Sequence, residues 1–262
     1  MLTFLNDYKI YEVPNRFSYQ HILLLLMDII YILMISLLLR NKNKKTQKIY
    51  FLVVNFLCIG LFVGRMFFGW ENARIYNQGS KTTLLPLELC NLNIFVSTFT
   101  ILLNKKTLYN YSYYISMIGG LIPLIVFPDC HMITNGNNLF HYMFIDYWFI
   151  HTHLVAIPIW MIVCRWFKPS IKAIPQTLLF LFIIYTFVFT SSLVLRNFPS
   201  FEGANYMYCI NDNNLPILKQ LHQWIPYPYL YALPLILPIT LLFYILGLPF
   251  IKANKKEALN NA

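Results

Sequence analysis

The sequence predicts an all-α, polytopic membrane protein built as a bundle of seven transmembrane helices. Its composition is the first reason, because 58% of the 262 residues are hydrophobic and only 11% are charged, which is more apolar than a soluble domain. The second reason is that several apolar stretches reach the roughly 20 residues that a helix needs to cross a bilayer. The third is that basic residues concentrate in alternate loops. We therefore expect one integral membrane domain over residues 1–262.

The apolar stretches and the polar loops between them place the seven predicted spans. In chain order the spans are about 20–39, 49–70, 84–103, 107–127, 140–164, 173–195 and 226–251. The first stretch is too long for the apolar core of a signal peptide and no small-residue cleavage site follows it, so we expect it to stay in the mature protein. The loop 196–225 is long enough to predict a lid or a binding surface.

The loop charges predict the orientation. Basic residues gather in the loops after the first, third, fifth and seventh spans: Arg40, Lys42, Lys44, Lys45, Lys48, Lys105, Lys106, Arg165, Lys168, Lys172, Lys252, Lys255 and Lys256. Because basic loops stay in the cytoplasm, the N-terminus is expected outside and the C-terminus inside, in the plasma membrane. The net charge of +10 then reflects topology and contact with anionic lipid headgroups, and no nucleic-acid partner is expected.

Polar and ionisable residues inside the spans are the candidate functional residues. The first, second, third and fifth spans carry them in this order: His21 and Asp28; Arg65; Glu88, Cys90, Asn91 and Asn93; and His141, Asp146, His151 and His153. In the predicted orientation all of them lie in the outer half of the bilayer or near its middle. Since a charge in lipid costs a few kcal/mol, such clustering predicts a shared polar cavity that opens toward the outer leaflet.

Helical periodicity refines the positions of these side chains. His21 and Asp28 are seven residues apart and share a stripe, while Cys90 and Asn93 lie close in angle. Because the third span is polar on several sides, we expect it at the centre of the bundle. Pro86 is tolerated there because it falls in the first turn of the span.

Structural roles compete with functional ones at several of these positions. Asp28 and Arg65 fit a structural ion pair as well as a site. Cys90 fits a small packing residue as well as a nucleophile. A single buried histidine is more often a satisfied interior residue than a catalyst, which applies to His151 and His153 alike.

Metal and disulfide chemistry are two further alternatives. His151 and His153, with Asp146 and Glu88, offer nitrogen and oxygen ligands. On one helix, however, the two rings point about 160° apart, which is poor for chelation. We therefore predict no metal and no other cofactor. Cys130 and Cys209 lie in two predicted outer loops, where a disulfide between them is possible. The sequence alone does not decide whether that bond forms.

Four motifs together resemble a known family. They are Leu85 to Asn91 (LPLELCN); Tyr147-Trp148 before His151, or Trp148-Phe149 before His153; Gly203 to Tyr208 (GANYMY), followed by Pro226-Tyr227-Pro228; and Phe17-Ser18 with His21. The chain resembles the YwaF-type bacterial integral membrane proteins, whose eukaryotic relatives include a transmembrane phospholipid acyltransferase. The resemblance spans most of the chain and implies a seven-helix bundle.

The resemblance also implies a chemistry. In the eukaryotic relatives a membrane cysteine acts with a histidine in acyl transfer, and Cys90 is the matching cysteine. The histidine is His151 or His153, with His151 favoured. The expected partner is a membrane phospholipid or lysophospholipid.

The residues themselves fit the same reaction. A neighbouring imidazole would activate the Cys90 thiol, and Asp146 would orient that histidine. Asn91, Asn93 or Asn205 would donate to the oxyanion. The predicted substrate-binding residues are Glu88, Asn91, Asn93, His21, Asp28, Arg65, Asn205 and Tyr206.

Two other functions fit the same polar cavity. One is a small-solute transporter or permease, although the sequence shows no inverted repeat. The other is a seven-helix sensor or binding protein without chemistry. The sequence does not predict the oligomeric state.

Overall fold

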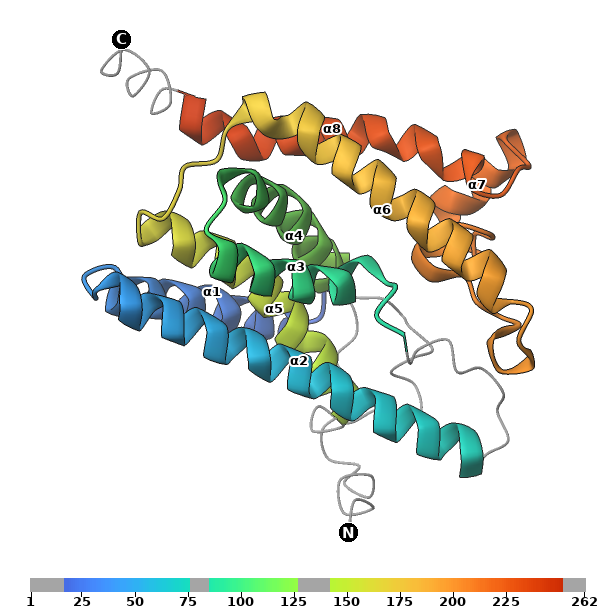
Figure 1. The fold of residues 1–262 in the computed structure, drawn as a ribbon, viewed down its shortest axis with the longest axis horizontal. Coiled ribbons are helices and arrows are strands. Elements are labelled where there is room, and N and C mark those ends of the chain that lie inside the picture. The colour runs from blue at the N-terminus through green and yellow to red at the C-terminus, as the bar shows by residue number, and fades with distance from the viewer. Residues whose placement is uncertain (1–16, 76–84, 127–141, 252–262) are drawn as a thin grey trace. The chain divides into compact units, whose positions relative to one another are not determined.

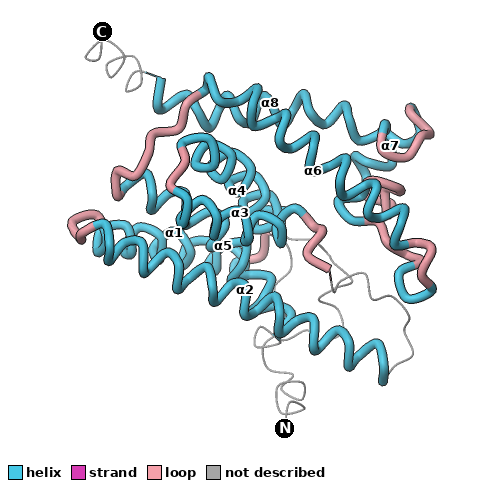
Figure 2. Tube along the Cα trace, viewed as in Figure 1, coloured by secondary structure: helices cyan, strands magenta, loops and turns pink. Residues whose placement is uncertain are grey.

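The computed structural model describes residues 17–75, 85–126 and 142–251, which form helices joined by short loops and, within those ranges, no strands (Figures 1 and 2). The α-helices are α1 (Tyr19–Leu39), α2 (Lys44–Ile75), α3 (Leu89–Leu103), α4 (Lys106–Val126), α5 (Tyr142–Val163), α6 (Ile174–Leu195), α7 (Pro216–Trp224) and α8 (Ile236–Gly247). The 3₁₀ turns are η3 (Ile171–Ala173), η4 (Pro199–Phe201), η5 (Tyr206–Tyr208), η6 (Leu230–Leu235) and η7 (Leu248–Phe250). The predicted all-α class is confirmed for this part of the chain.

The chain divides into two compact units. The described residues of the first unit are 17–65, 93–126 and 142–168, and those of the second are 66–75, 85–92 and 169–251. Helices α2 and α3 therefore each contribute residues to both units. The prediction of a single integral domain stays a prediction.

Helices α4 and α5 form the centre of the first unit, and α1 packs on α5. The close approach of α4 and α5 depends on Gly120, because a Cβ atom there would lie 2.7 Å from the carbonyl oxygen of His151 and from a methyl group of Val155. Trp160 on α5 is fully buried, and its indole N–H donates to the carbonyl of Ile32 on α1 at 3.1 Å. The centre of the unit is thus held by backbone proximity as well as by side-chain packing.

Side chains from neighbouring helices satisfy carbonyl groups at the helix ends of the first unit. The last four carbonyls of a helix lack partners within it. At the end of α4, the hydroxyl of Tyr147 donates to the carbonyl of Pro123 at 2.8 Å. After the end of α5, the ammonium group of Lys44 donates to the carbonyl of Cys164 at 2.7 Å. These contacts help to fix the positions of α2 and α4 along the axis of α5.

The second unit is built on α6 and α8, which pack against each other over part of their length (Figure 1). The segment 196–229 connects them and contains η4, η5 and α7. Turn η5 packs on α6, and α7 packs on η6 at the start of the last apolar stretch. The long loop predicted at 196–225 is therefore a folded segment with its own short helix.

Five helical stretches are long and apolar enough to cross a membrane in the described part of the chain. They are Tyr19–Leu39, Lys44–Phe67, Phe144–Val163, Ile171–Leu195 and Leu230–Phe250. Helix α3 is apolar but has only 15 residues. Helix α4 has 21 residues, but its run of tyrosines and serines lowers its hydropathy. The multi-pass membrane character is confirmed, whereas seven spans and the orientation stay predictions.

The start of the third predicted span is wrong by about one turn. Residues 85–88 form a bend and a turn, and α3 begins at Leu89. The cause is tertiary, because Leu85 and Leu87 pack against the apolar cluster of the second unit. The backbone of this segment follows that packing instead of continuing the helix.

Candidate functional site

The polar residues predicted to line one cavity are divided between the two units. The first unit holds His21, Asp28, Arg65, Asn93, Asp146, His151 and His153. The second unit holds Glu88, Cys90, Asn91, Asn205 and Tyr206. Their contacts separate residues with structural partners from residues with unused hydrogen-bonding capacity.

His153 is a histidine with both ring nitrogens engaged. Its Nδ1 lies 2.7 Å from the carbonyl oxygen of Phe149, which can only accept, so Nδ1 carries the proton. Its Nε2 then accepts from the hydroxyl of Tyr31 at 3.0 Å. The side chain is 3% exposed and also packs edge-on against Trp160. These contacts are those of an interior residue that joins α1 to α5.

His151 differs from His153 at one atom. Its Nδ1 donates to the carbonyl of Tyr147 at 2.6 Å, which leaves the lone pair of the neutral ring on Nε2. Among the described residues, Nε2 of His151 has no hydrogen-bond partner. A buried imidazole with a fixed tautomer and an open lone pair is the form that can accept a proton.

The acidic residues of the first unit have partners other than the predicted ones. Asp28 accepts from the indole N–H of Trp148 at 3.3 Å and from the hydroxyl of Thr152 at 3.1 Å. Asp146 forms an ion pair with Arg65 at 3.0 Å, with its own side chain fully buried. The alternative of a structural ion pair thus applies to Arg65 with Asp146, and Asp28 is held by α5.

The carboxylate of Asp146 is not the orienting group of either histidine in the structure. Apart from the ion pair with Arg65, neither of its oxygens has a hydrogen-bond partner within the described residues. The carbonyls of Tyr147 and Phe149 take the Nδ1 protons instead. The tautomer of each ring is therefore set by the backbone of α5 itself.

His21 joins the start of α1 to the end of α4. Ser18 caps the start of α1 by accepting from the backbone N–H of His21 at 3.3 Å. The Nδ1 atom of His21 accepts from the backbone N–H of Phe17 at 3.0 Å, so Nε2 carries the proton and donates to the carbonyl of Leu124 at 2.8 Å. The predicted substrate-binding residue is thus engaged in joining α1 to the end of α4.

Asn93 has an unused donor inside the first unit. Its side chain is fully buried, and its Oδ1 accepts from the hydroxyl of Tyr111 at 3.4 Å. Its Nδ2 has no hydrogen-bond partner within the described residues. That nitrogen lies 3.5 Å from where a Cβ of Gly119 would stand, while the backbone of His151 lies against the next residue, Gly120. Asn93 and His151 thus approach α4 at neighbouring glycines.

In the second unit, two of the motifs noted in the sequence lie together. The carboxylate of Glu88 accepts from the backbone N–H of Met207 in η5 at 3.1 Å. Leu85, Leu87 and Leu92 pack against the buried cluster that contains Tyr206 and Cys209. The segment that leads to Cys90 is therefore bound to the GANYMY segment.

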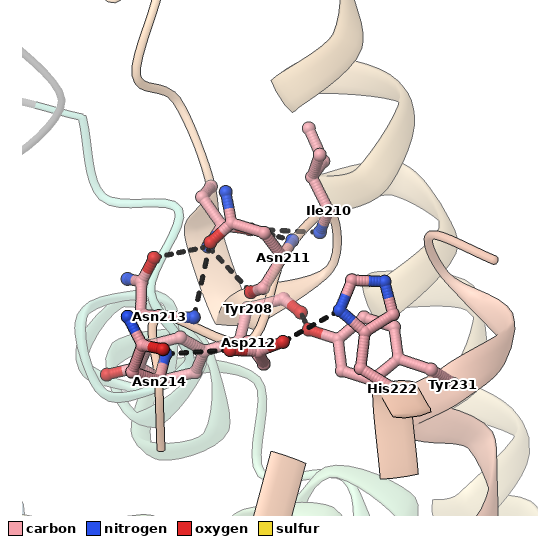
Figure 3. A network of polar contacts seen from close by, with 9 residues as sticks. Tyr208, Ile210, Asn211, Asp212, Asn213, Asn214, His222 and Tyr231 are labelled. Carbon is pink, nitrogen blue, oxygen red and sulfur yellow. Dashed lines mark hydrogen bonds and ion pairs between the residues drawn. The ribbon is translucent and has the colours of Figure 1, made fainter. Parts of the chain in front are cut away.

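Asn205 organises the connecting segment. Its Oδ1 accepts from the backbone N–H groups of Ile210 and Asn211 at 2.9 and 3.1 Å, and its Nδ2 donates to Asn211 and Asn213. Figure 3 shows the network that continues through Asp212 to His222 on α7. The amide of Asn205 is fully used in this network, which favours a structural role.

Tyr206, Asn91 and Cys90 differ in how far they are exposed. The side chain of Tyr206 is 2% exposed, and its hydroxyl has no hydrogen-bond partner in the described part of the chain. Asn91 is 3% exposed in the first turn of α3. Cys90 is half-buried, one residue before Asn91 and one helical turn before Asn93. The predicted nucleophile is thus more accessible than the asparagines beside it.

The other cysteines of the described residues are buried. Cys58 and Cys164 are buried, as expected for packing residues. Cys209 is a free cysteine whose thiol donates to the hydroxyl of Ser192 at 3.5 Å, and burial raises the pKa of this thiol. Cys130, the other half of the disulfide left open above, lies outside the described residues, as do His131 and His141.

Metal-ligating side chains do not gather in the described part of the chain. No group of three or more His, Cys, Asp or Glu residues there has the proximity that a metal ion needs. His151 and His153 make separate contacts, the first with the carbonyl of Tyr147 and the second with the hydroxyl of Tyr31.

Three residues that decide these roles were not predicted from the sequence. Tyr31 engages His153, Tyr147 engages His151, and Thr152 engages Asp28. One signal was available, because Tyr147 and Phe149 each precede a histidine by four residues, the spacing of a helical hydrogen bond. The contact of Tyr31 with His153 and that of Thr152 with Asp28 had no such signal, because both depend on how α1 packs on α5.

A comparison with protein families gives one match. The model of the TMEM164 family matches residues 16–246, which cover nearly all of the helices described above. No curated protein and no solved structure matches the chain. The finer resemblance to YwaF-type proteins stays a prediction.

Proposed function

The chain belongs to the TMEM164 family, a family of transmembrane proteins, and from this premise we propose that it is a membrane acyltransferase in which Cys90 carries a fatty acyl chain between phospholipids. The observation that carries the proposal is the contrast between the two histidines of α5. His153 is saturated, whereas His151 keeps an open Nε2 lone pair on a neutral ring. His151 is accordingly the proposed general base.

The first half of the reaction loads the enzyme. Nε2 of His151 takes the proton of the Cys90 thiol, and the sulfur attacks the carbonyl carbon of a phospholipid ester. The ester C–O bond breaks, the acyl chain stays on sulfur as a thioester, and the proton passes from His151 to the departing lysophospholipid oxygen. The buried N–H of Asn93, which has no acceptor of its own among the described residues, would donate to the oxyanion.

The second half returns the enzyme to its starting state. The hydroxyl of an acceptor lysophospholipid gives its proton to Nε2 of His151 and attacks the thioester carbonyl. The C–S bond breaks, and the thiolate takes the proton back from the imidazolium. The cycle needs no cofactor, and it requires only that the Cys90 sulfur and Nε2 of His151 meet.

Acyl transfer in vesicles tests the proposal. Purified protein is placed in vesicles that contain a phospholipid with a deuterated acyl chain and an unlabelled lysophospholipid, and mass spectrometry follows the label. We expect transfer by the wild type, loss of transfer in Cys90→Ala, and unchanged transfer in the packing control Cys58→Ala. Intact mass should show a hydroxylamine-sensitive acyl adduct on Cys90. Equal transfer by Cys90→Ala would disprove this mechanism and favour a transporter or a sensor.

Disulfide trapping tests whether the two groups meet. His151→Cys is oxidised in membranes and the peptides are mapped for a bond to Cys90, with His153→Cys as the matched control on the other side of α5. We expect a bond between Cys90 and the thiol introduced at position 151. Its absence beside an efficient bond to the thiol introduced at position 153 would assign the base to His153.

The proposal includes seven spans in the plasma membrane with the N-terminus outside. Support comes from the basic loops, and the proposal requires α3 and α4 to span in addition to the five apolar stretches. A single cysteine introduced by Lys105→Cys, between α3 and α4, tests this. We expect an impermeant maleimide to label it only from the cytoplasmic side. Labelling from the outer side instead would contradict the proposed combination of seven spans and an outside N-terminus.

A further inference from the structure

Helix α7 has an exposed apolar stripe on the side away from its packing partner. Ile217 and Trp224 are 69% and 71% exposed, and with Leu221 they occupy positions four and seven residues apart, which form one face of a helix. The buried Leu218 faces the protein. Lys219 and Gln223 lie on the far side of the helix from Ile217. An exposed apolar stripe with a large aromatic residue indicates a surface that contacts a partner or a membrane.

The position of α7 in the chain indicates where this stripe lies. The stretches Ile171–Leu195 and Leu230–Phe250 are both candidate membrane spans, and α6 and α8 pack against each other over part of their length. The segment between two consecutive spans begins and ends at the same membrane surface. Because α7 ends at Trp224, six residues before Leu230, it lies close to that surface.

Contacts hold α7 at the level where the last span begins. The ring of His222 on α7 stacks on that of Tyr231 in η6, with centroids 4.5 Å apart. The same imidazole donates from Nδ1 to the carboxylate of Asp212 at 2.7 Å (Figure 3). A helix fixed against the first turn of a span lies at the boundary between headgroups and acyl chains.

Exposed apolar residues also occur along the chain that leads from α7 into the last span. Tyr227 and Leu230 are 63% and 46% exposed, and Leu237 and Leu241 on α8 are 73% and 61% exposed. In a membrane-spanning helix such exposed residues would face lipid, and η6, on which α7 packs, is the start of that span. Tryptophan is enriched at this boundary because its ring is apolar and its N–H is polar.

We infer that α7 is an interfacial helix, whose Ile217–Leu221–Trp224 face inserts into the lipid bilayer while Lys219 and Gln223 face the water and the headgroups. Such helices lie in the membrane plane with the apolar face roughly 5–10 Å below the boundary. Through Asp212 and the Asn205 network, this anchor holds the segment that binds Glu88. The inference does not depend on acyl transfer.

Spin-label accessibility tests the inference in vesicles of zwitterionic phospholipid. Ile217→Cys and Trp224→Cys are labelled in a chain with Cys90→Ser and Cys130→Ser, with Lys219→Cys and Gln223→Cys as matched controls on the same helix. Collision with oxygen should exceed collision with a water-soluble nickel complex at 217 and 224, and the ratio should invert at 219 and 223. Equal nickel accessibility at all four positions would overturn the inference.

A lipid photolabel gives a second measurement that needs no substitution. A phospholipid with a diazirine near the headgroup end of its acyl chain is activated in vesicles that contain the wild-type protein. Adducts are expected at Ile217 or Trp224 as well as at Leu237 on α8. Adducts on α8 without any on α7, or crosslinks from α7 to a second copy of the chain, would contradict a lipid-facing α7.

Discussion

Helices α5 and α6 are both 22 residues long and both belong to candidate membrane spans. They differ in how far they are buried and in the partners of their polar side chains. The apolar stretch of α5 is 67% buried and that of α6 is 11% buried. On α6, the hydroxyl of Thr190 donates to carbonyls of its own helix. On α5, Thr152 and His153 bond to side chains of α1.

The difference shows what a polar residue in an apolar helix indicates. A hydroxyl that bonds back to its own helix needs no protein neighbour, so it is tolerated where a helix faces lipid. A carboxylate or an imidazole that bonds across helices requires that neighbour. The residue type, more than hydropathy, therefore distinguishes the buried helix from the lipid-facing one.

Removing the two α5 histidines in turn is the sharpest test of the comparison, with the largest expected effect. We expect His151→Ala to lower acyl transfer per folded protein by about 10²–10⁴-fold, the usual worth of a general base. His153→Ala should instead lower thermal stability and leave the transfer rate of the folded fraction within a few-fold of wild type. Equal losses of rate in both variants would contradict the assignment of distinct roles.

The buried ion pair between Arg65 on α2 and Asp146 on α5 gives the next largest effect. Arg65→Leu leaves the carboxylate of Asp146 buried without its partner, and we expect a loss of about 3–5 kcal/mol in the free energy of unfolding. The double variant Arg65→Leu/Asp146→Leu should regain much of that loss, because no unpaired charge remains. Thr190→Val on α6 serves as the lipid-facing control and should change stability little. Denaturant unfolding in mixed micelles measures all three.

Glycine substitutions test whether α4 must approach α5 closely. At Gly120 a Cβ would lie 2.7 Å from the His151 carbonyl, whereas at Gly60 on α2 nothing lies within 4 Å. We expect Gly120→Ala to destabilise the protein by about 1–3 kcal/mol. Gly60→Ala should be neutral or stabilise by up to about 1 kcal/mol, through the higher helix propensity of alanine. Similar stabilities for the two variants would show that α4 and α5 are less closely packed than described.

The smallest effect concerns pH and the connecting segment of the second unit. Hydrogen bonds from His222 and from the backbone N–H of Asn214 lower the pKa of Asp212 below its ordinary value. A lowered carboxyl pKa stabilises the fold above the unfolded pKa of about 4, and the contribution is lost as pH falls through the folded value. Amide exchange in 210–224, corrected for intrinsic rates, should therefore accelerate as pH falls below about 4.

A pair of charge-removing variants checks that assignment. Asp212→Asn should abolish the pH dependence of exchange in residues 210–224. Glu202→Gln removes an exposed carboxyl earlier in the connecting segment 196–229 and should preserve that pH dependence. A pH dependence that persists in Asp212→Asn would assign it to another group.

Hydropathy and helix periodicity were enough to predict most helices. The predicted spans 20–39, 107–127 and 173–195 fall within a residue of α1, α4 and α6 at each end. The errors occur where packing overrides local preference. Helix α3 starts late because Leu85 and Leu87 join the cluster of the second unit, and α7 was missed because nine residues are too few for a periodicity signal.

The candidate site was predictable in its residue types and not in its contacts. Sequence alone grouped His151 with His153 and Asp28 with Arg65, since each pair lies at a similar predicted depth. What separates them is the rotation of α1 and α2 about their axes, which brings Tyr31 to His153 and Arg65 to Asp146. Those rotations depend on tertiary packing, so they cannot be predicted from the spacing of residues along one helix.

The hydrogen bonds that fix the two imidazoles have a consequence for how the protein is made. Both acceptors are carbonyls four residues earlier in α5, so the bonds form as soon as the helix does. Each ring can therefore be transferred into the membrane as a neutral group with one nitrogen already bonded, whether or not α1 or α4 is in contact. The insertion machinery thus meets a helix whose histidines cost less to transfer into lipid than two charged or unbonded rings would.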